Sequence, residues 1–275
     1  MLLRDGMVPV HWWTHKPNFG DLLAPWLVGK ITGRPVLYAE NHQPAYAVIG
    51  SILGHVGSDT VVWGVGSFGT ESLEALGRRG AGALVHAVRG PLTRNRLLMA
   101  GIDCPRVYGD PALLVPEFHP RATEPVHELG LVIRHSEQRW RRQFNAPGVL
   151  LIDLKSDDVE GVLDQILSCR RILTSSLHGL IIADAYGIPS AWLASSTPAG
   201  REFKYWDYFC STEKLRPSLD LDLTGAGWTA ERLLSDVPYD GRPIRIDLEL
   251  LKDRCPFWPG SAVFEEASAS DPERR

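Results

Sequence analysis

Short runs of apolar, β-branched residues alternate with stretches of helical spacing along most of this 275-residue chain. In the first half the strand-like runs are residues 10–13, 45–50, 60–65, 84–88 and 106–108. Helices are expected between them, at residues 20–33 and at residues 91–100, where the run begins with proline and ends before Gly101. Strands that alternate with helices form parallel sheets, because a parallel pair needs a long crossover connection. The sequence therefore predicts an α/β fold.

The alternation is interrupted at residues 115–125, which contain three prolines and have no sustained periodicity. It then resumes with strand-like runs at 130–133, 149–153, 171–174 and 190–193, and with helical runs at 159–168 and 180–186. We therefore expect two Rossmann-like domains, residues 1–120 and 126–260, which face each other across a cleft lined by the carboxyl ends of their strands. Residues 261–275 are rich in Ser, Asp, Glu and Arg, and we expect a disordered tail there.

The composition argues against several classes of protein. Lys and Arg number 29 against 33 Asp and Glu, so the net charge of −4 gives no general attraction for nucleic acid. The four cysteines are widely spaced and show no zinc-ligand or disulfide pattern. The sequence has no run of about 18 apolar residues, and residues 1–10 lack the apolar core of a signal peptide. We expect a cytoplasmic protein that needs no metal and no cofactor.

The segment 174–189 is the most informative for function, because an apolar strand leads into two hydroxyls and a histidine where a helix begins. Ser175 or Ser176 is expected to cap that helix, and the amides of its first turn suit an anionic group such as phosphate or carboxylate. His178 would lie beside the anion. The alternative is structural: Ser175 only caps the helix, and His178 hydrogen-bonds to a neighbouring loop.

Two further turns carry polar residues next to strand-like runs. In Asn18-Phe19-Gly20-Asp21, Gly20 would let the backbone approach a ligand, while Asp21 would cap the helix, orient a substrate hydroxyl, or do both. The second turn, residues 109–114, places Asp110 after the run 106–108. Asp110-Pro111 is a common start of a turn, so we expect a structural role there first.

Three cationic side chains are candidates for binding an anion. Arg134 follows the run 130–133 and Arg89 follows the run 84–88, so both guanidinium groups should emerge at the carboxyl ends of strands. A planar guanidinium at that place can grip a carboxylate or a phosphate. Lys204 offers a further cation. The alternative for each of the three is an ordinary surface ion pair.

The segments 18–21, 109–114 and 174–189 together resemble the polysaccharide pyruvyl transferase family, and the resemblance covers most of residues 11–210. It implies two domains of the GT-B type. It also implies transfer of the carbon skeleton of phosphoenolpyruvate to sugar hydroxyls as a pyruvate ketal, with release of phosphate. Phosphoenolpyruvate would be a co-substrate. The acceptor would belong to a bacterial surface polysaccharide or exopolysaccharide, or to its lipid-linked precursor, which would bring the protein to the inner face of the membrane.

The resemblance also implies roles for single residues. His178 would protonate C3 of the donor, and Asp21 or Asp110 would help to remove the proton of the attacking hydroxyl. The residues expected to bind the donor are Arg89, Arg134, Ser175, Ser176, Gly179 and Lys204. The residues expected on the acceptor side are Trp13, Asn18 and Gly20.

One position departs from the family pattern. Ser176 stands directly before the Leu177-His178 pair, where many similar proteins carry arginine. Either Arg89, Arg134 or Lys204 supplies the missing cation, or the donor or the reaction differs. Two other functions therefore stay open: a glycosyltransferase that uses a nucleotide sugar, since a fold does not fix function, and a non-catalytic glycan-binding protein of the same fold.

Overall fold

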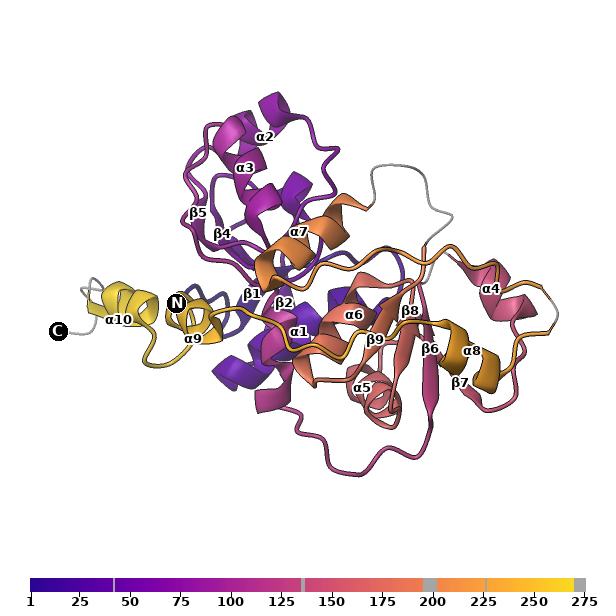
Figure 1. Cartoon of the computed structure of the whole chain (residues 1–275). Coiled ribbons are helices and arrows are strands. Elements are labelled where there is room, and N and C mark those ends of the chain that lie inside the picture. Colours follow the sequence, from indigo (N-terminus) through magenta and orange to yellow (C-terminus); the bar gives the residue numbers. More distant parts are fainter. Residues whose placement is uncertain (42, 135–136, 195–201, 226, 270–275) are drawn as a thin grey trace.

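The protein contains two parallel β-sheets flanked by helices (Figure 1). The structure is a computed structural model, and it describes residues 1–41, 43–134, 137–194, 202–225 and 227–269. The α/β class and the two Rossmann-like series of parallel strands, both predicted from the alternation of runs, are confirmed. None of the described helices is both long enough and apolar enough to span a bilayer.

The first sheet has the strand order β2-β1-β3-β4-β5, and each neighbouring pair is parallel. Its strands are β1 (Val8–His11), β2 (Val36–Tyr38), β3 (Ala45–Ala47), β4 (Thr60–Trp63) and β5 (Leu84–Ala87). The connections contain helices α1 (Phe19–Thr32) and α2 (Leu73–Gly80) and the 3-10 helix η1 (Leu53–His55), and helix α3 (Pro91–Met99) follows β5. Helix α1 ends where Gly33 adopts the left-handed conformation, with φ of 63°, and donates its N–H to the carbonyl of Gly29.

The second sheet has the order β7-β6-β8-β9 and is also parallel. Its strands are β6 (Leu129–Ile133), β7 (Val149–Asp153), β8 (Ile172–Thr174) and β9 (Ser190–Trp192), and its helices are α4 (Gln138–Gln143), α5 (Val159–Leu167) and α6 (Leu177–Ala185). All five residues of β6 are buried, as expected for a central strand covered on both faces. In both sheets the winding reverses beside the first strand, between β1 and β3 and between β6 and β8. Such reversals are where α/β proteins bind ligands.

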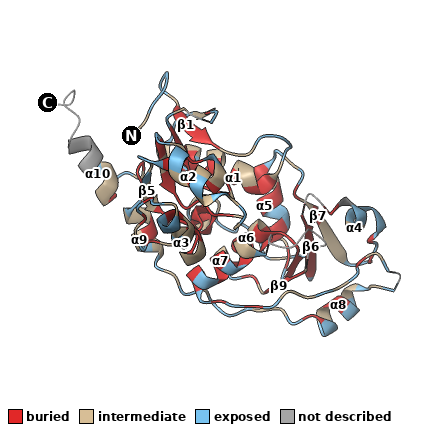
Figure 2. Ribbon diagram, turned by 90° about the horizontal axis from the view of Figure 1, so that it is seen from above, coloured by how far each residue is buried: buried red, intermediate tan, exposed pale blue. Residues whose placement is uncertain are grey.

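The two halves share one hydrophobic core. Helix α1 contributes Leu23 and Leu27, and helices α5 and α6 contribute Leu163 and Ile181. The 3-10 helix η2 (Pro111–Glu117) packs against α6 and adds Leu114 to the same cluster. The buried residues follow this seam and the two sheets, whereas α2, α4 and α8 expose many side chains (Figure 2).

The C-terminal third adds helices α7 (Phe203–Thr212), α8 (Ala230–Asp236), α9 (Leu248–Asp253) and α10 (Ala262–Ala269). The chain returns to the first half at α9. Trp63 donates its indole N–H to the carbonyl of Leu251 at 2.9 Å, and Phe257 packs edge-on against Tyr46 and Trp63. The predicted second domain, 126–260, therefore has its last residues packed on the first sheet.

Three sequence predictions differ from the structure. Residues 106–108 form no strand, because only Tyr108 pairs, through a single bridge to Val88. The interruption predicted at residues 115–125 begins inside η2. In the predicted disordered tail, residues 262–269 form α10, and residues 270–275 lie outside the described residues.

Candidate functional site

A cavity of about 550 Å³ opens where both sheets present the carboxyl ends of their strands. The loops after β1, β3 and β4 line it from the first half, and the segments after β6, β7 and β8 line it from the second. The lining residues are Trp13, Asn18, Asp21, Ser51, Ile52, His55, Phe68, Thr70, Arg134, Leu154, Ser176, Leu177, His178 and Lys204. The structure therefore brings together seven of the predicted site residues: Trp13, Asn18, Asp21, Arg134, Ser176, His178 and Lys204.

His178 lies in the first turn of α6, and its imidazole is almost completely buried. The ring packs directly over Gly20: a Cβ atom at that glycine would lie only 2.0 Å from Nδ1 of His178. Gly20 therefore makes room for the imidazole of His178 and not, as predicted from the sequence, for a ligand, and it is not among the lining residues. Burial, together with the positive charges of Lys204 and Arg89, lowers the pKa of His178 to about 3, so the imidazole is neutral at pH 7.

Asp110 lies behind His178 and is completely buried. Its Oδ1 accepts a hydrogen bond from the N–H of Ala112 at 3.1 Å, which caps η2 and agrees with the structural role expected from Asp110-Pro111. Its Oδ2 points at the imidazole, 3.9 Å from Nε2 of His178. Burial raises the pKa of Asp110 to about 6, against the lowering effect of Arg89.

Asp21 lies at the start of α1 and reaches the cavity wall. Its Oδ2 accepts a hydrogen bond from the side-chain amide of Asn18, the residue at the N-cap position, so neither side chain caps the helix. Burial raises the pKa of Asp21 to about 6, and the Asn18 hydrogen bond and Lys204 lower it in part. A carboxylate whose pKa lies close to neutral pH can accept a proton from a substrate hydroxyl.

Two cations line the cavity from the second half. Arg134 follows β6, as expected, and its backbone N–H donates to Oγ of Ser175 at 3.0 Å, which fixes the strand end to the start of α6. Lys204 enters from α7, with its ammonium 5.0 Å from the ring centre of Tyr205 and 5.9 Å from that of Phe68. Arg134 is only 7% exposed, so it lines the cavity in a poorly hydrated place.

Arg89 is placed differently from the expectation that it contacts the donor. It is completely buried and absent from the cavity wall. Its Nε donates to Asp207 at 3.2 Å, its Nη1 to Oγ of Ser51 at 2.9 Å, and its Nη2 to the carbonyl of Ser67 at 2.9 Å. The guanidinium thus ties α7 to the first sheet and orients Ser51, which does line the cavity.

Ser175, Ser176 and Gly179 shape the start of α6. Ser175 is buried: its Oγ accepts from Arg134, and its carbonyl accepts from the Tyr205 hydroxyl at 2.6 Å. Ser176 is the residue at the N-cap position and lines the cavity, but its side chain makes no capping hydrogen bond. Gly179 is not a lining residue, and a Cβ atom there would lie 2.4 Å from Oγ1 of Thr174. Gly179 therefore allows α6 to pack closely on β8.

Several lining residues, among them His55, were not predicted from the sequence. His55 lies at the end of η1, and its Nδ1 is 3.1 Å from Oδ1 of Asn41. Since that oxygen can only accept, Nδ1 carries the proton and Nε2 keeps a lone pair. Burial and the neighbouring His11, Arg79 and His15 lower the pKa of His55. The sequence shows no feature around His55, Ser51 or Phe68 that would have singled them out, because strand ends meet only in the folded chain.

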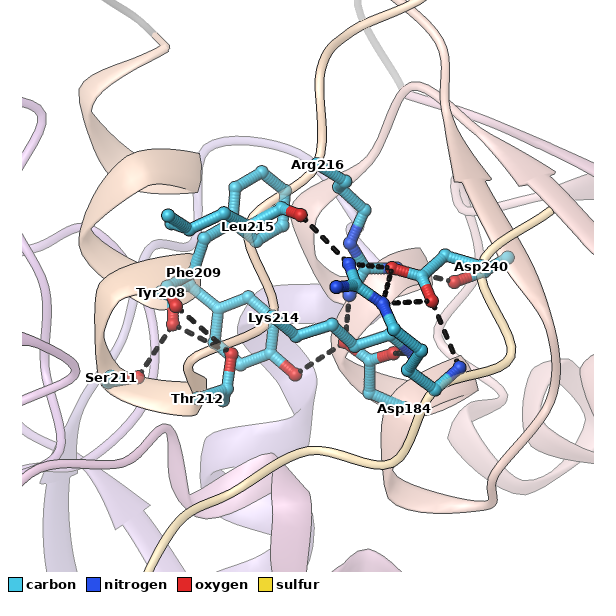
Figure 3. Close-up of polar contacts among 11 residues, drawn as sticks. Asp184, Tyr208, Phe209, Ser211, Thr212, Lys214, Leu215, Arg216 and Asp240 are labelled. Atoms are coloured by element: carbon cyan, nitrogen blue, oxygen red, sulfur yellow. Dashed lines mark hydrogen bonds and ion pairs between the residues drawn. The ribbon is translucent and has the colours of Figure 1, made fainter. Parts of the chain in front are cut away.

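A separate buried cluster lies at the opposite end of α6 (Figure 3). Asp184 accepts from Nζ of Lys214 at 2.7 Å, from Nη2 of Arg216, and from the Tyr208 hydroxyl at 2.9 Å. Arg216 also donates to Oγ of Ser190 at 2.9 Å and stacks over Phe209. These contacts join α6, α7, β9 and the segment directly after α7, so the cluster fixes the helix that carries His178 to the helix that carries Lys204.

The fold and the cavity define an α/β protein with buried cations, a histidine and carboxylates at the reversal points of two parallel sheets, an arrangement suited to group transfer from an anionic substrate. Among the described residues, no three His, Cys, Asp or Glu side chains are grouped as metal ligands. The family model for polysaccharide pyruvyl transferase matches residues 48–197, and the chain belongs to this family.

Two curated proteins are similar to this chain. The succinoglycan biosynthesis protein ExoV of Rhizobium meliloti is 25% identical, over 98% of this chain and 78% of that protein. The uncharacterized protein L143 of Acanthamoeba polyphaga mimivirus is 27% identical, over 72% of each chain. Among solved structures, a functionally uncharacterized protein from Klebsiella pneumoniae subsp. pneumoniae aligns with a TM-score of 0.46 at 10% identity, over 74% of this chain and 89% of that one. The family and ExoV support a transferase that acts in polysaccharide biosynthesis.

Proposed function

We propose that the protein transfers a pyruvyl group from phosphoenolpyruvate to two hydroxyls of one sugar in a bacterial surface polysaccharide or exopolysaccharide, or in its lipid-linked precursor. The product is a pyruvate ketal, and phosphate is released. The observation that carries this proposal is the shared cavity, in which the two cations Arg134 and Lys204 lie with His178 and Asp21. No metal ion or cofactor takes part in the reaction as proposed.

The donor carries a carboxylate and a phosphate, and both need cations. Arg134 and Lys204 bind these groups, and Ser176 and the amides at the start of α6 add hydrogen bonds to the anion. Ser176 is neutral, whereas many similar proteins carry arginine at this position. In this protein Lys204 and Arg134 provide the positive charge instead. Each well-placed hydrogen-bond donor of the protein stabilises the negative charge that develops in the transition state by about 3 kcal/mol.

The chemical steps use two side chains that line the cavity, His178 from the second half and Asp21 from the first. His178 gives a proton to C3 of the donor, which makes C2 electrophilic, and Asp21 accepts the proton of the first attacking hydroxyl. Phosphate then leaves C2, and the second hydroxyl attacks to close the ring. Of the two hydroxyl protons, one replaces the proton that C3 gained and the other leaves with phosphate, so the reaction is balanced.

The acceptor enters from the side of the first half. Trp13 is stacked on His15, with ring centres 5.5 Å apart, and forms a broad apolar surface on which a sugar ring packs. Asn18 holds Asp21 by its hydrogen bond, so that the carboxylate faces the cavity. His55, with an unprotonated Nε2, is a second hydroxyl-binding group on this side.

The test is phosphate release from phosphoenolpyruvate with a panel of bacterial lipid-linked and nitrophenyl sugars, for the wild type, His178→Ala and Arg134→Ala. Arg232→Ala is the matched control, because Arg232 pairs with Asp236 on the exposed surface of α8. We expect acceptor-dependent release by the wild type and the control and none by the two cavity variants. Stabilisation by UDP or GDP, together with no release with any acceptor, would show a glycosyltransferase. Sugar binding without any turnover, unchanged in His178→Ala, would show a glycan-binding protein.

A further inference from the structure

Two polar atoms behind the cavity face each other without any hydrogen bond. Oδ2 of Asp110 and Nε2 of His178 are both shielded from solvent, and neither has a hydrogen-bond partner among the described residues. They are 3.9 Å apart, slightly beyond hydrogen-bond distance. Unpartnered buried polar atoms are rare, and each costs about 1–3 kcal/mol. Two such atoms that face each other indicate that the pair serves the function of the protein and not its stability.

The backbone holds Asp110 in this place. Gly109 has φ of 144°, a conformation that side chains rarely adopt, and a Cβ atom there would lie 2.7 Å from Leu251. The capping bond from Ala112 to Oδ1 fixes the carboxyl group, so that Oδ2 is directed at the imidazole. The Gly109-Asp110 turn thus does more than begin η2.

The charges around His178 come from several elements. Asp110 at the start of η2 is the carboxylate that faces Nε2. Lys204 on α7 and Arg89 after β5 oppose a positive charge on the ring. Arg134 and Asp21 share the cavity with it. On the other side of the ring, Nδ1 lies over Gly20, in the turn that supplies Asn18 and Asp21 to the cavity wall.

We propose that Asp110 is a positioning residue for His178: it holds the proton on Nε2, so that Nδ1 is the atom that takes up the transferable proton when an anion occupies the cavity. The proposal rests on the proposed function for the identity of that anion. A carboxylate that faces one ring nitrogen fixes the tautomer and stabilises the imidazolium, as in other acid–base pairs.

The consequence is a coupling between donor binding and protonation. Burial, together with the positive charges of Lys204 and Arg89, lowers the pKa of His178 and keeps its imidazole neutral when no anion is bound. A bound phosphate and carboxylate offset the charge of Lys204, and the charge of Asp110 then favours the doubly protonated ring. The proton comes from solvent as the donor binds, moves from Nδ1 to C3 during the reaction, and leaves the ring neutral with Nε2–H intact.

The test is ¹⁵N NMR of the histidine side chains, because the nitrogen shifts report the tautomer and the protonation state separately. The signal of His178 is assigned with His178→Asn. In the free wild type at pH 7 we expect a neutral ring with the proton on Nε2, and on addition of phosphoenolpyruvate we expect both nitrogens protonated. Asp110→Asn keeps the capping oxygen but offers an N–H to Nε2, so we expect the proton to move to Nδ1.

Asp164→Asn is the matched control. It also removes a carboxylate from a histidine, since Nε2 of His119 lies 2.8 Å from Asp164, but on the surface. We expect it to change the signal of His119 alone. In turnover, Asp110→Asn should lower kcat about 100-fold with little change in KM and shift the acidic limb of the pH profile. A residue that only caps η2 would change the melting temperature and leave the tautomer and the pH profile as they are.

The proposal is overturned if the free wild type carries its proton on Nδ1, or if Asp110→Asn keeps the wild-type tautomer. The wild-type spectrum gives this answer even when the variant does not fold. The outcome for the proposed function is read separately: if phosphoenolpyruvate shifts no cavity signal while inorganic phosphate or another anion protonates the ring, the positioning role stands and the donor assignment fails.

Discussion

The two ends of helix α6 carry buried charged or titratable side chains, and these side chains differ in whether they have hydrogen-bond partners. At its C-terminal end, Asp184 is matched by Lys214, Arg216 and the Tyr208 hydroxyl (Figure 3). At its N-terminal end, Nε2 of His178 and Oδ2 of Asp110 have no hydrogen-bond partner among the described residues. One helix thus separates a cluster that holds the fold from a pair that is ready for a ligand. In the C-terminal cluster the carboxylate of Asp184 is satisfied, and Nε of Arg216 is the one atom of these three charged side chains without a hydrogen-bond partner among the described residues. Satisfied polar groups stabilise a structure, whereas two unsatisfied groups that face each other call for an explanation, here a functional one.

The largest effect is expected for His178→Ala, which should lower the rate of phosphate release about 1,000- to 10,000-fold, because it removes the proton donor. Its free energy of unfolding should be close to that of the wild type, since the imidazole makes no hydrogen bond through Nε2. Steady-state kinetics and urea unfolding measure the two quantities. His119→Ala, which removes a histidine paired with Asp164 at the surface, should change neither by much. A His178→Ala protein that is active but unstable would show that the N-terminal end of α6, like its C-terminal end, serves stability.

Asp184→Ala should have the opposite signature. It leaves Lys214 and Arg216 buried without their anion, so we expect a loss of about 3–5 kcal/mol in the free energy of unfolding. Urea unfolding measures it, with Asp236→Ala as the control, because Asp236 pairs with Arg232 in solvent. At a temperature where the variant is folded, its rate per folded molecule should stay within a few-fold of wild type. A large loss of rate in fully folded protein would show that this cluster takes part in the reaction.

Gly20→Ala sharpens the comparison because it moves a titratable side chain without replacing one. The new methyl group would lie 2.0 Å from Nδ1 of His178, so the ring must move away from its place. We expect a rate about 100-fold lower, since small displacements of a catalytic group are costly. Gly29→Ala in the same helix is the matched control: its nearest neighbours would be 3.7 Å away, so it should keep full activity and stabilise α1 by about 0.5–1 kcal/mol. Equal activity of the two variants would show that the position of the ring does not matter.

Asp21→Asn is expected to have a small effect on stability, and in the stabilising direction. The pKa of Asp21 is about 6 in the folded protein, because burial raises it, against 3.8 for the same carboxyl group in the unfolded chain. Between these values the folded protein binds more protons, so wild-type stability falls as pH rises from 4 to 6. The asparagine has no such cost, and we expect it to exceed wild type by about 1–2 kcal/mol at pH 7 and to match it near pH 4.

Urea unfolding at several pH values checks the Asp21 prediction, and phosphate release by the same variant should fall, because the hydroxyl loses its base. A variant that is less stable than wild type at pH 7 would contradict the view that the cavity charges cost stability.

The sequence predicts the part of this fold that depends on local pattern. The alternation of runs predicts the α/β class, and helix α5 and strand β7 were placed almost to the residue because their periodicity is clear. The C-terminal return to the first sheet was missed: the contact between Trp63 and Leu251 joins residues far apart in sequence, and no local pattern encodes it. The single bridge at Tyr108 shows the reverse, a short apolar run that finds no partner strand.

The candidate site was predicted where a residue follows a strand or begins a helix, as for Arg134, Asp21 and His178. Position alone does not tell which way a side chain faces. Arg89 also follows a strand, yet Asp207 on α7 draws its guanidinium into the interior. The buried ion pairs of Asp184 could not be predicted from the sequence, because its partners Lys214 and Arg216 come from a later part of the chain.

The most direct test of the account follows the donor carbon. Phosphoenolpyruvate labelled with ¹³C at C2 is incubated with the protein and an acceptor sugar, and the product is examined by NMR. The account predicts that in the wild type the label becomes a ketal carbon joined to two oxygens of one sugar, and that His178→Ala forms no such product. Label that stays in phosphoenolpyruvate or appears as free pyruvate with every acceptor, while a nucleotide sugar is consumed, would contradict it.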